Sequence, residues 1–227
     1  MNENEKKTNA VAIDGPAGAG KSTIAKLIAK KMNYIYVDTG AMYRAMALYL
    51  LRTGIDEDDT EAIEKACENA DISIDYIDGE QVVLLNGENV NPYIRTEEVG
   101  KMASKSSVNP KVREKLVSLQ QELAKKKSVV MDGRDIGTKV LPDAEVKIFL
   151  TASASVRAKR RYDELVAKGE ECDLALIEKD IIERDQRDTN RAISPLKQAE
   201  DAILVDTSDL SIEEVTEKIT AIINGDR

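Results

Sequence analysis

Short apolar runs separated by amphipathic stretches organise both ends of the chain. Five runs predict buried strands, at residues 9–14, 34–38, 128–132, 146–152 and 202–208. Amphipathic stretches predict helices at 21–32, 110–127, 155–169, 174–192 and 211–224, the last begun by Ser211 with Glu214 in capping-box spacing. Strands that alternate with helices indicate an α/β fold whose five-stranded parallel sheet is flanked by helices.

The middle of the chain departs from this alternation. Residues 39–54 and 56–70 predict two helices, and residues 72–90 then alternate between apolar and polar side chains. Asp78-Gly79 and Asn86-Gly87 are typical of hairpin turns, so a small antiparallel sheet is expected here. We therefore predict a core of residues 10–38 and 128–227, with an inserted lobe at 39–127.

Composition fits a soluble globular chain of 227 residues, 42% hydrophobic and 33% charged. No apolar run approaches the ~20 residues that span a bilayer. The polar residues 1–9 lack the apolar segment of a signal peptide and are interpreted as a frayed tail. These features predict a cytoplasmic protein. No apolar stripe demands an oligomer, which favours a monomer.

The chain contains no histidine and only two cysteines, Cys67 and Cys172. This excludes Cys/His zinc sites, Ser-His-Asp triads and histidine phosphotransfer. A net charge of −9 argues against general binding to nucleic acid or to an anionic membrane. However, six of the twelve arginines lie between Arg157 and Arg191, a concentration that suits a small anionic ligand.

A glycine-rich loop follows the first predicted strand. Its residues match the phosphate-loop pattern Gly-x-x-x-x-Gly-Lys-Ser. In such a loop, the backbone N–H groups and the N-terminus of the next helix bind phosphate oxygens. Lys21 is expected to bridge the β- and γ-phosphates of ATP, and Ser22 to bind Mg²⁺. Asp132, at the end of a core strand, is a second candidate for the metal, or alternatively a turn or capping residue. The predicted nucleotide-binding residues are Gly15, Pro16, Ala17, Gly18, Ala19, Gly20, Lys21, Ser22 and Thr23.

Arginines near the carboxyl ends of strands suggest a second phosphate site. Arg44 follows the second strand and Arg134 the third, whereas Arg184, Asp188 and Arg191 are spaced i, i+4, i+7, as on one face of a helix. Alone, this spacing also fits a solvated, salt-bridged face. Two phosphate sites together favour a kinase for a small phosphorylated acceptor. A GTPase is disfavoured because Asn-Lys-x-Asp is absent.

Five segments together resemble the bacterial cytidylate kinase family: GPAGAGKST, DTGAMYR, IRTEEVG, DGRDIGTKVLPDAEVKIFL and ERDQRDTNRAISPLKQAEDAILVDTS. The likeness runs from about Val11 to the C-terminus. It implies a P-loop kinase core with an inserted monophosphate-binding lobe. The basic stretch that begins at Arg157 and the flexible residues KGEEC after it suggest a short lid at roughly 158–173. The implied reaction is Mg²⁺-dependent phosphorylation of CMP and dCMP by ATP.

The resemblance also implies roles for individual residues. Arg44, Arg134 and Arg191 would hold the acceptor phosphate, with Lys21 and Asp132 completing the catalytic set. Ser104, Arg113 and Asp135 would read the cytosine edge, and Arg184 and Asp188 would hold the ribose. Thr39 and Tyr43 join the substrate set, although Tyr43 either stacks or simply packs. Ser104 and Arg113 are expected on polar helix faces.

Several alternatives stay open at this point. Arg157, Arg160 and Arg161 belong either to a lid, in which Arg157 and Arg161 contact ATP, or to a solvated basic helix. The competing functions are a kinase for UMP, AMP or a shikimate-type acceptor, and a non-catalytic nucleotide sensor. The preference between CMP and dCMP is not decided by these residues.

Overall fold

The computed structural model describes residues 8–77 and 79–225. The chain divides into two compact units: unit 1 comprises Met1–Tyr36 and Ser128–Arg227, and unit 2 comprises Val37–Lys127. Most of the predicted N-terminal tail, and Asp78 of the first predicted hairpin turn, lie outside the described residues. Within the described part of the chain, no helix is both long enough and apolar enough to cross a membrane.

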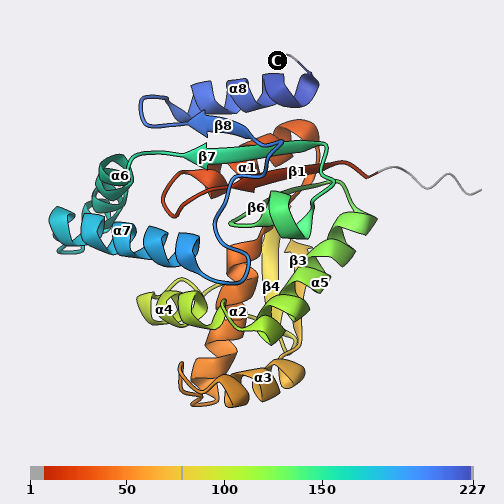
Figure 1. The fold of residues 1–227 in the computed structure, drawn as a ribbon, viewed down its shortest axis with the longest axis vertical. Coiled ribbons are helices and arrows are strands. Elements are labelled where there is room, and N and C mark those ends of the chain that lie inside the picture. The colour runs from red at the N-terminus through yellow and green to blue at the C-terminus, as the bar shows by residue number, and fades with distance from the viewer. Residues whose placement is uncertain (1–7, 78, 226–227) are drawn as a thin grey trace, which may run out of the picture. The chain divides into compact units, whose positions relative to one another are not determined.

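A five-stranded sheet forms the centre of unit 1, with strand order β2-β6-β1-β7-β8. Strand β1 pairs in parallel with β6 and β7, and β7 pairs in parallel with β8, beside which it lies in Figure 1. The predicted sheet is thus confirmed. The strands are β1 (Ala10–Asp14), β2 (Ile35–Asp38), β6 (Val129–Gly133), β7 (Val146–Thr151) and β8 (Ile203–Asp206). Strand β1 is apolar at successive positions because neighbouring elements cover both of its faces.

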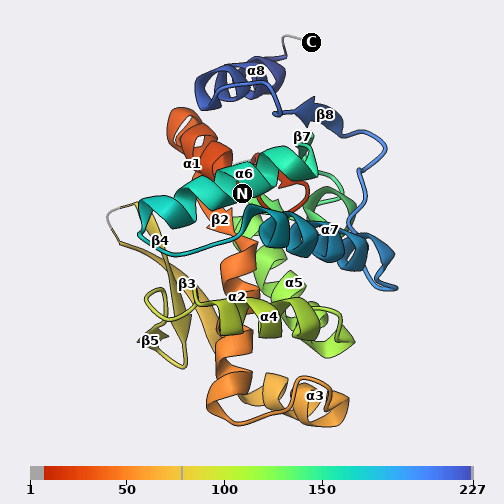
Figure 2. The same cartoon turned by 90° about the vertical axis from the view of Figure 1, so that its left-hand side faces the viewer.

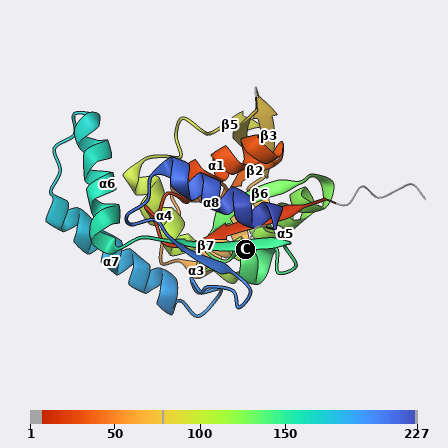
Figure 3. The ribbon, with the colours of Figure 1, turned by 90° about the horizontal axis from the view of Figure 1, so that it is seen from above.

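Helices complete unit 1. α1 packs against β6 and α8, whereas α6 and α7 pack against each other and lie side by side in Figure 3. Their bounds are α1 (Lys21–Met32), α6 (Ala154–Ala167), α7 (Leu174–Asn190) and α8 (Ile212–Asn224), together with a π-helical turn, η1 (Ile136–Val140). The predicted capping box of α8 is confirmed, with Ser211 and Glu214 each accepting a backbone N–H of the other.

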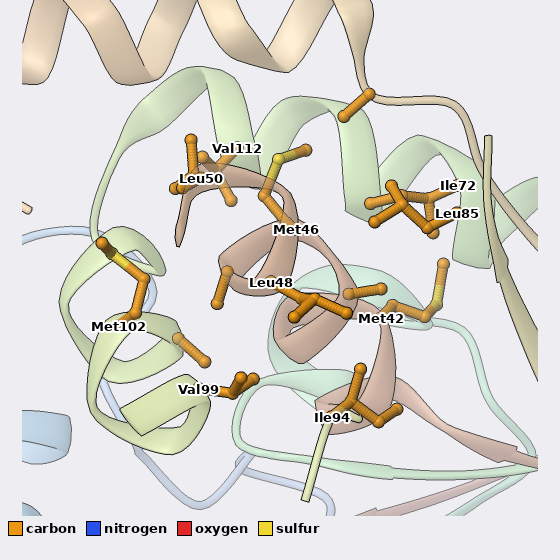
Figure 4. Packing of buried hydrophobic residues seen from close by; sticks show 14 of the residues in the cluster. Met42, Met46, Leu48, Leu50, Ile72, Leu85, Ile94, Val99, Met102 and Val112 are labelled. Carbon is orange, nitrogen blue, oxygen red and sulfur yellow. The ribbon is translucent and has the colours of Figure 1, made fainter. Parts of the chain in front are cut away.

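Unit 2 is built around α2 (Thr39–Arg52), which contacts the other helices of the unit and strands β3 and β4. Met42, Met46 and Leu50 of α2 are buried in one cluster; in Figure 4, Leu50 and Met46 lie near Val112, and Met42 lies near Leu85 and Ile94. The other helices are α3 (Thr60–Asn69), α4 (Glu97–Ser106) and α5 (Pro110–Lys126). The acidic helix predicted from residue 56 begins only at Thr60, because the Asp59 side chain caps it by accepting the Ala62 N–H.

A three-stranded antiparallel sheet belongs to unit 2, as the alternating pattern predicted. β3 (Ile72–Ile77), β4 (Glu80–Leu85) and β5 (Glu88–Asn89) lie in that order, visible in Figure 2. Asn86 and Gly87 connect β4 to β5 with φ values of 50° and 82°. Positive φ at both central residues is what a type I′ hairpin requires, and it explains why Asn-Gly occupies this turn.

Candidate active site

The phosphate loop leaves the carboxyl end of the central strand β1. At Gly15, φ is +149°, and a Cβ placed there would lie 1.9 Å from the carbonyl oxygen of Leu150. Only glycine can therefore pass this close to strand β7. The N-cap residue of α1, which follows the loop, is Gly20 and offers no side-chain hydrogen bond to the helix. The first N–H groups of α1 and the positive end of its dipole are suited to an anion.

Lys21 is a buried cation at the start of α1. Its side-chain Nζ donates to the carbonyl oxygen of Pro16 at 2.7 Å, which places the ammonium group inside the curve of the loop. Burial, and then the charge of Arg134, lower the pKa of Lys21, and the charges of Asp132 and Asp14 only partly oppose this. An anionic ligand would relieve the repulsion, so the loop is electrostatically prepared for phosphate.

Ser22 and Asp132 meet at the end of the loop. The Ser22 hydroxyl donates to Asp132 Oδ2 at 3.0 Å, and the Tyr36 hydroxyl donates to Oδ1 of the same carboxylate at 2.9 Å. Asp132 is buried at the carboxyl end of β6, the neighbour of β1. The structure therefore brings together Ser22 and Asp132, the two residues that the sequence predicted as metal ligands.

A second charged cluster in unit 1 joins the segment after β6 to the C-terminal end of α7. Arg134 Nε donates to Asp188 Oδ2 at 2.9 Å, and Arg191 Nη2 lies 3.9 Å from Asp135 Oδ1. Burial raises the pKa of Asp188, but the charges of Arg134, Arg184 and Arg191 outweigh it and hold the pKa below its usual value. Three arginines thus surround one buried carboxylate.

Arg191 differs from its predicted position. Helix α7 ends at Asn190, and Arg191 is its C-cap in an extended conformation, with φ −63° and ψ 140°. The prediction that Arg184, Asp188 and Arg191 share one face of one helix is therefore wrong for Arg191. A helix continued through Pro195 would bring the proline ring against the Arg191 carbonyl, four residues earlier. The extended residue instead directs Nε to the carbonyl oxygen of Ser194, at 2.5 Å.

The candidate substrate residues of unit 2 also gather around one another. The Arg113 guanidinium lies 5.6 Å from the centroid of the Tyr43 ring, and its Nη1 donates to the carbonyl oxygen of Ser107 at 3.2 Å. Ser107 in turn donates its hydroxyl to the carbonyl oxygen of Ser104, and Ser104 is half-buried. Arg113 is only 5% exposed, so its expected place on a polar helix face is wrong. The contact with the Tyr43 ring and the hydrogen bond to Ser107 offset part of the cost of burying this charge.

Two further candidates of unit 2 belong to α2. Thr39 is buried in its first turn. Arg44 Nη1 lies 3.5 Å from the carbonyl oxygen of Ile94, and a Cβ at Gly100 would come within 3.2 Å of the same nitrogen.

The three arginines of α6 occupy different environments. Arg157 is buried beneath the phosphate loop, where it donates to the carbonyl oxygens of Ala17 and Ala152 and forms an ion pair of 2.6 Å with Asp185 of α7. Arg160 donates to Thr207. Arg161 is exposed and paired with Glu164, as on a solvated helix face. Arg157 therefore supports the loop, a role that its sequence position did not predict.

Comparison with known proteins identifies the family. The family model described as Cytidylate kinase matches residues 11–225. The chain is 55% identical to a curated protein named Cytidylate kinase from Caldicellulosiruptor saccharolyticus over 214 residues, 94% of each chain. It is 54% identical to one of the same name from Lactobacillus johnsonii over 213 residues, 94% of this chain and 93% of that one. The chain belongs to the cytidylate kinase family.

Solved structures agree with this membership at the level of fold. A shikimate kinase from Bacteroides thetaiotaomicron is 15% identical, with a TM-score of 0.50, and the match covers 95% of this chain and 98% of that one. An uncharacterised protein from Eubacterium ventriosum is 14% identical with a TM-score of 0.52, covering 96% and 99% of the two chains. The phosphate loop of this cytidylate kinase family member therefore lies in a kinase-like α/β fold.

Sequence reasoning did not select Asp14. This residue ends β1, is 4% exposed, and accepts the backbone N–H groups of Ile136 and Gly137. The sequence did contain one indication of its importance, an acidic residue at the end of an otherwise apolar strand. Its partners lie more than 120 residues further along the chain, so no local pattern could have identified them.

Asp14 predicts a pH dependence of stability. Burial raises its pKa to about 6, although the two N–H groups it accepts lower the value in part. Between its ordinary pKa of 3.8 and about 6, the folded state holds a proton that the unfolded state has lost. The contribution of Asp14 to the free energy of unfolding is therefore fully present below pH 3.8 and is lost as the pH rises through 6.

Urea unfolding of the wild type and of Asp14→Asn from pH 4 to pH 7.5 would measure this effect. The difference in unfolding free energy, wild type minus variant, should fall by about 2.4 kcal/mol over that range. Other titrating groups are common to both proteins and largely cancel in the difference. A difference that does not change with pH would show that the pKa of Asp14 is not raised.

Proposed function

We propose that this protein transfers the γ-phosphoryl group of ATP directly to CMP and dCMP, giving ADP and CDP or dCDP. The observation that carries the proposal is electrostatic. Within unit 1, Lys21 of the phosphate loop is close enough to Arg134 and Arg184 for their charges to lower its pKa. A site for a nucleoside triphosphate thus adjoins a second cationic cluster suited to another phosphate. Membership of the cytidylate kinase family supports the assignment of the acceptor.

The donor half of the proposal uses the phosphate loop. Residues Gly15 to Thr23 would bind the ATP phosphates through backbone N–H groups, with Lys21 bridging the β- and γ-phosphates. Ser22 and Asp132 would hold Mg²⁺. Their oxygens fit this ion, because Mg²⁺ prefers oxygen ligands and uses one or two side chains together with substrate phosphates and waters. When bound, the ion would neutralise charge on the phosphates.

The acceptor half follows the family resemblance residue by residue. Arg134 and Arg191 of unit 1 and Arg44 of unit 2 would bind the CMP phosphate. Asp135 would accept a hydrogen bond from the cytosine amino group, and Ser104 and Arg113 would donate to the ring acceptors. Arg184 and Asp188 would bind the ribose, and Thr39 and Tyr43 would complete the substrate set. Uracil carries a carbonyl where cytosine carries its amino group, so Asp135 would disfavour UMP.

This chemistry requires no strong base. The attacking atom is an oxygen of the CMP phosphate, which is already an anion at neutral pH, and a chain without histidine is compatible with that. The chain's own contribution would be alignment of the two phosphates and stabilisation of charge by Lys21, Arg134 and Arg191. Arg157 would act mainly by supporting the loop, since its guanidinium is buried among protein partners. Arg161 is exposed and would exchange its surface pair with Glu164 for ATP.

The same proposal gives each part of the chain a role. Residues 10–38 and 128–227 would form the kinase core, residues 39–127 the monophosphate-binding lobe, and roughly 158–173 a lid that excludes water. A monomeric state and a cytoplasmic location remain predictions.

A panel of acceptors tests the proposed function. Purified protein with Mg²⁺-ATP would be offered CMP, dCMP, UMP, AMP, GMP and shikimate, with ADP release as the measured rate. We expect the highest kcat/KM with CMP or dCMP, and at least about fivefold less with UMP, because one mismatched hydrogen-bonding edge costs about 1–3 kcal/mol. Equal or faster turnover of UMP, AMP or GMP would exclude the cytosine assignment, and faster turnover of shikimate would exclude a nucleotide acceptor.

A further inference from the structure

Asp14 is a buried carboxylate that the proposed function does not use. It is the last residue of β1 and directly precedes Gly15, the first residue of the phosphate loop. Its side chain is neither part of the loop nor a member of the acceptor cluster. A buried carboxylate is costly unless its oxygens are hydrogen-bonded, so its partners indicate what it does.

Both oxygens of Asp14 bind the segment that follows Arg134 and Asp135. Oδ1 accepts the backbone N–H of Ile136, and Oδ2 accepts that of Gly137, each at 2.7 Å. These two residues begin η1, so the carboxylate binds the first N–H groups of the turn. The base of the donor loop and the segment that carries two acceptor residues are thus joined by one side chain.

Gly137 is closely enclosed by neighbouring side chains. A Cβ at position 137 would lie 3.4 Å from Asp14 Oδ2 and 3.2 Å from Lys147 Cδ. Its φ is not in the left-handed region, so the close approach, rather than backbone conformation, favours glycine here. The closer of the two contacts is with Lys147, so a methyl group at position 137 would crowd the turn beside the Asp14 contact mainly through that side chain.

Charged groups of the proposed site lie near the Asp14 carboxylate. Asp135 repels the carboxylate and Lys21 attracts it, and both belong to the proposed site. Lys147 is the other buried cation nearby, and it forms an ion pair with Asp201. The protein thus holds a carboxylate next to Asp135 in spite of repulsion between the two.

We propose that Asp14 is a positioning residue, which fixes the Arg134–Asp135 segment relative to the phosphate loop so that donor and acceptor groups keep one geometry. The inference rests on the proposed function, because the segment matters for catalysis only if Arg134 and Asp135 bind the acceptor. Asp14 itself touches neither substrate. Misplacement of a binding group by about 1 Å costs up to about a hundredfold in rate, so a loosened segment should be measurable.

Asp14→Asn is the first test. An amide offers one acceptor oxygen for two N–H groups and turns its own NH₂ toward the other. We expect kcat with CMP to fall at least about tenfold, the KM for ATP to stay within about twofold, and the ratio of kcat/KM for CMP over UMP to decrease, because Asp135 is displaced. Asp143→Asn, an exposed substitution in the same unit, should behave as the wild type.

Gly137→Ala is the second test, for the case in which Asp14→Asn folds poorly. Its methyl group would lie 3.2 Å from Lys147 Cδ and so would crowd the turn whose N–H groups Asp14 binds. We expect a smaller fall in kcat and a loss of discrimination in the same direction. Val205→Ala, at the buried position of the edge strand β8, serves as a control of stability alone. It should lower Tm while the CMP-to-UMP ratio stays unchanged.

Amide hydrogen exchange separates this inference from the proposed function. In Asp14→Asn, exchange at Ile136 and Gly137 should accelerate at least about tenfold, whether or not CMP is the substrate. Unchanged protection at both amides, or wild-type kcat and CMP-to-UMP ratio in both variants, would overturn the role of Asp14. Absence of CMP phosphorylation by the wild type would instead overturn the proposed function, and with it the claim that the segment serves the acceptor.

Discussion

Lys21→Met should lower kcat for CMP phosphorylation on the order of a thousandfold. Methionine keeps much of the length and apolar body of lysine but cannot stabilise the charge that develops on the transferring phosphoryl group. Lys21 is buried at the start of α1 and already points into the phosphate loop through its bond to Pro16. Initial rates of ADP release with Mg²⁺-ATP and CMP, at several concentrations of each, would measure kcat and both KM values.

Stability should distinguish this loss from unfolding. Burial lowers the pKa of Lys21, so its charged form is costly in the folded protein, and methionine removes that cost. The Tm of Lys21→Met should therefore equal or exceed that of the wild type. Lys30→Met, at an exposed position of the same helix, is the matched control and should keep wild-type rates. A kcat above a tenth of the wild-type value in Lys21→Met would remove this lysine from the proposed mechanism.

Local patterns were sufficient for several elements, among them the strand that leads into the donor site. The apolar run before Gly15 predicted β1, and Ser211 with Glu214 predicted the start of α8, because both signals depend on neighbouring residues only. Asn86-Gly87 predicted its turn for the same reason. To predict that Ser22 and Asp132 lie together, one further rule was needed: the carboxyl ends of parallel strands meet at the same edge of the sheet.

Contacts distant in sequence were not predictable in this way. Arg113 carries a charge, so its position indicated a polar helix face, whereas the fold buries it against the ring of Tyr43. Arg157 is buried beneath the loop because Asp185, on another helix, compensates its charge. Asp14 and the π-helical turn at Ile136 depend on each other across the sheet. In each case the charged side chain is buried because a residue distant in sequence contacts it, and the pattern of hydrophobic positions contains no information about such contacts.

Arg191→Ala should lower kcat/KM for CMP by about a hundredfold to a thousandfold. Charge-assisted hydrogen bonds from arginine to phosphate are among the strongest that side chains make, and alanine removes them. The Arg191 side chain is only 7% exposed, and its bond to the Ser194 carbonyl oxygen holds it at the end of α7. Because the residue is assigned to the acceptor, the KM for CMP should rise while the KM for ATP changes little.

Two further variants test whether the effect is specific to this guanidinium. Arg187→Ala removes an exposed arginine from the same helix and should leave kcat/KM within about twofold of the wild type, as surface charges contribute little. Arg191→Lys should recover only part of the activity, since an ammonium group cannot make the paired bonds of a guanidinium. If Arg191→Ala instead raised the KM for ATP alone, Arg191 would belong to the donor site, and the phosphate of CMP would have to be bound by Arg134 and Arg44 without it.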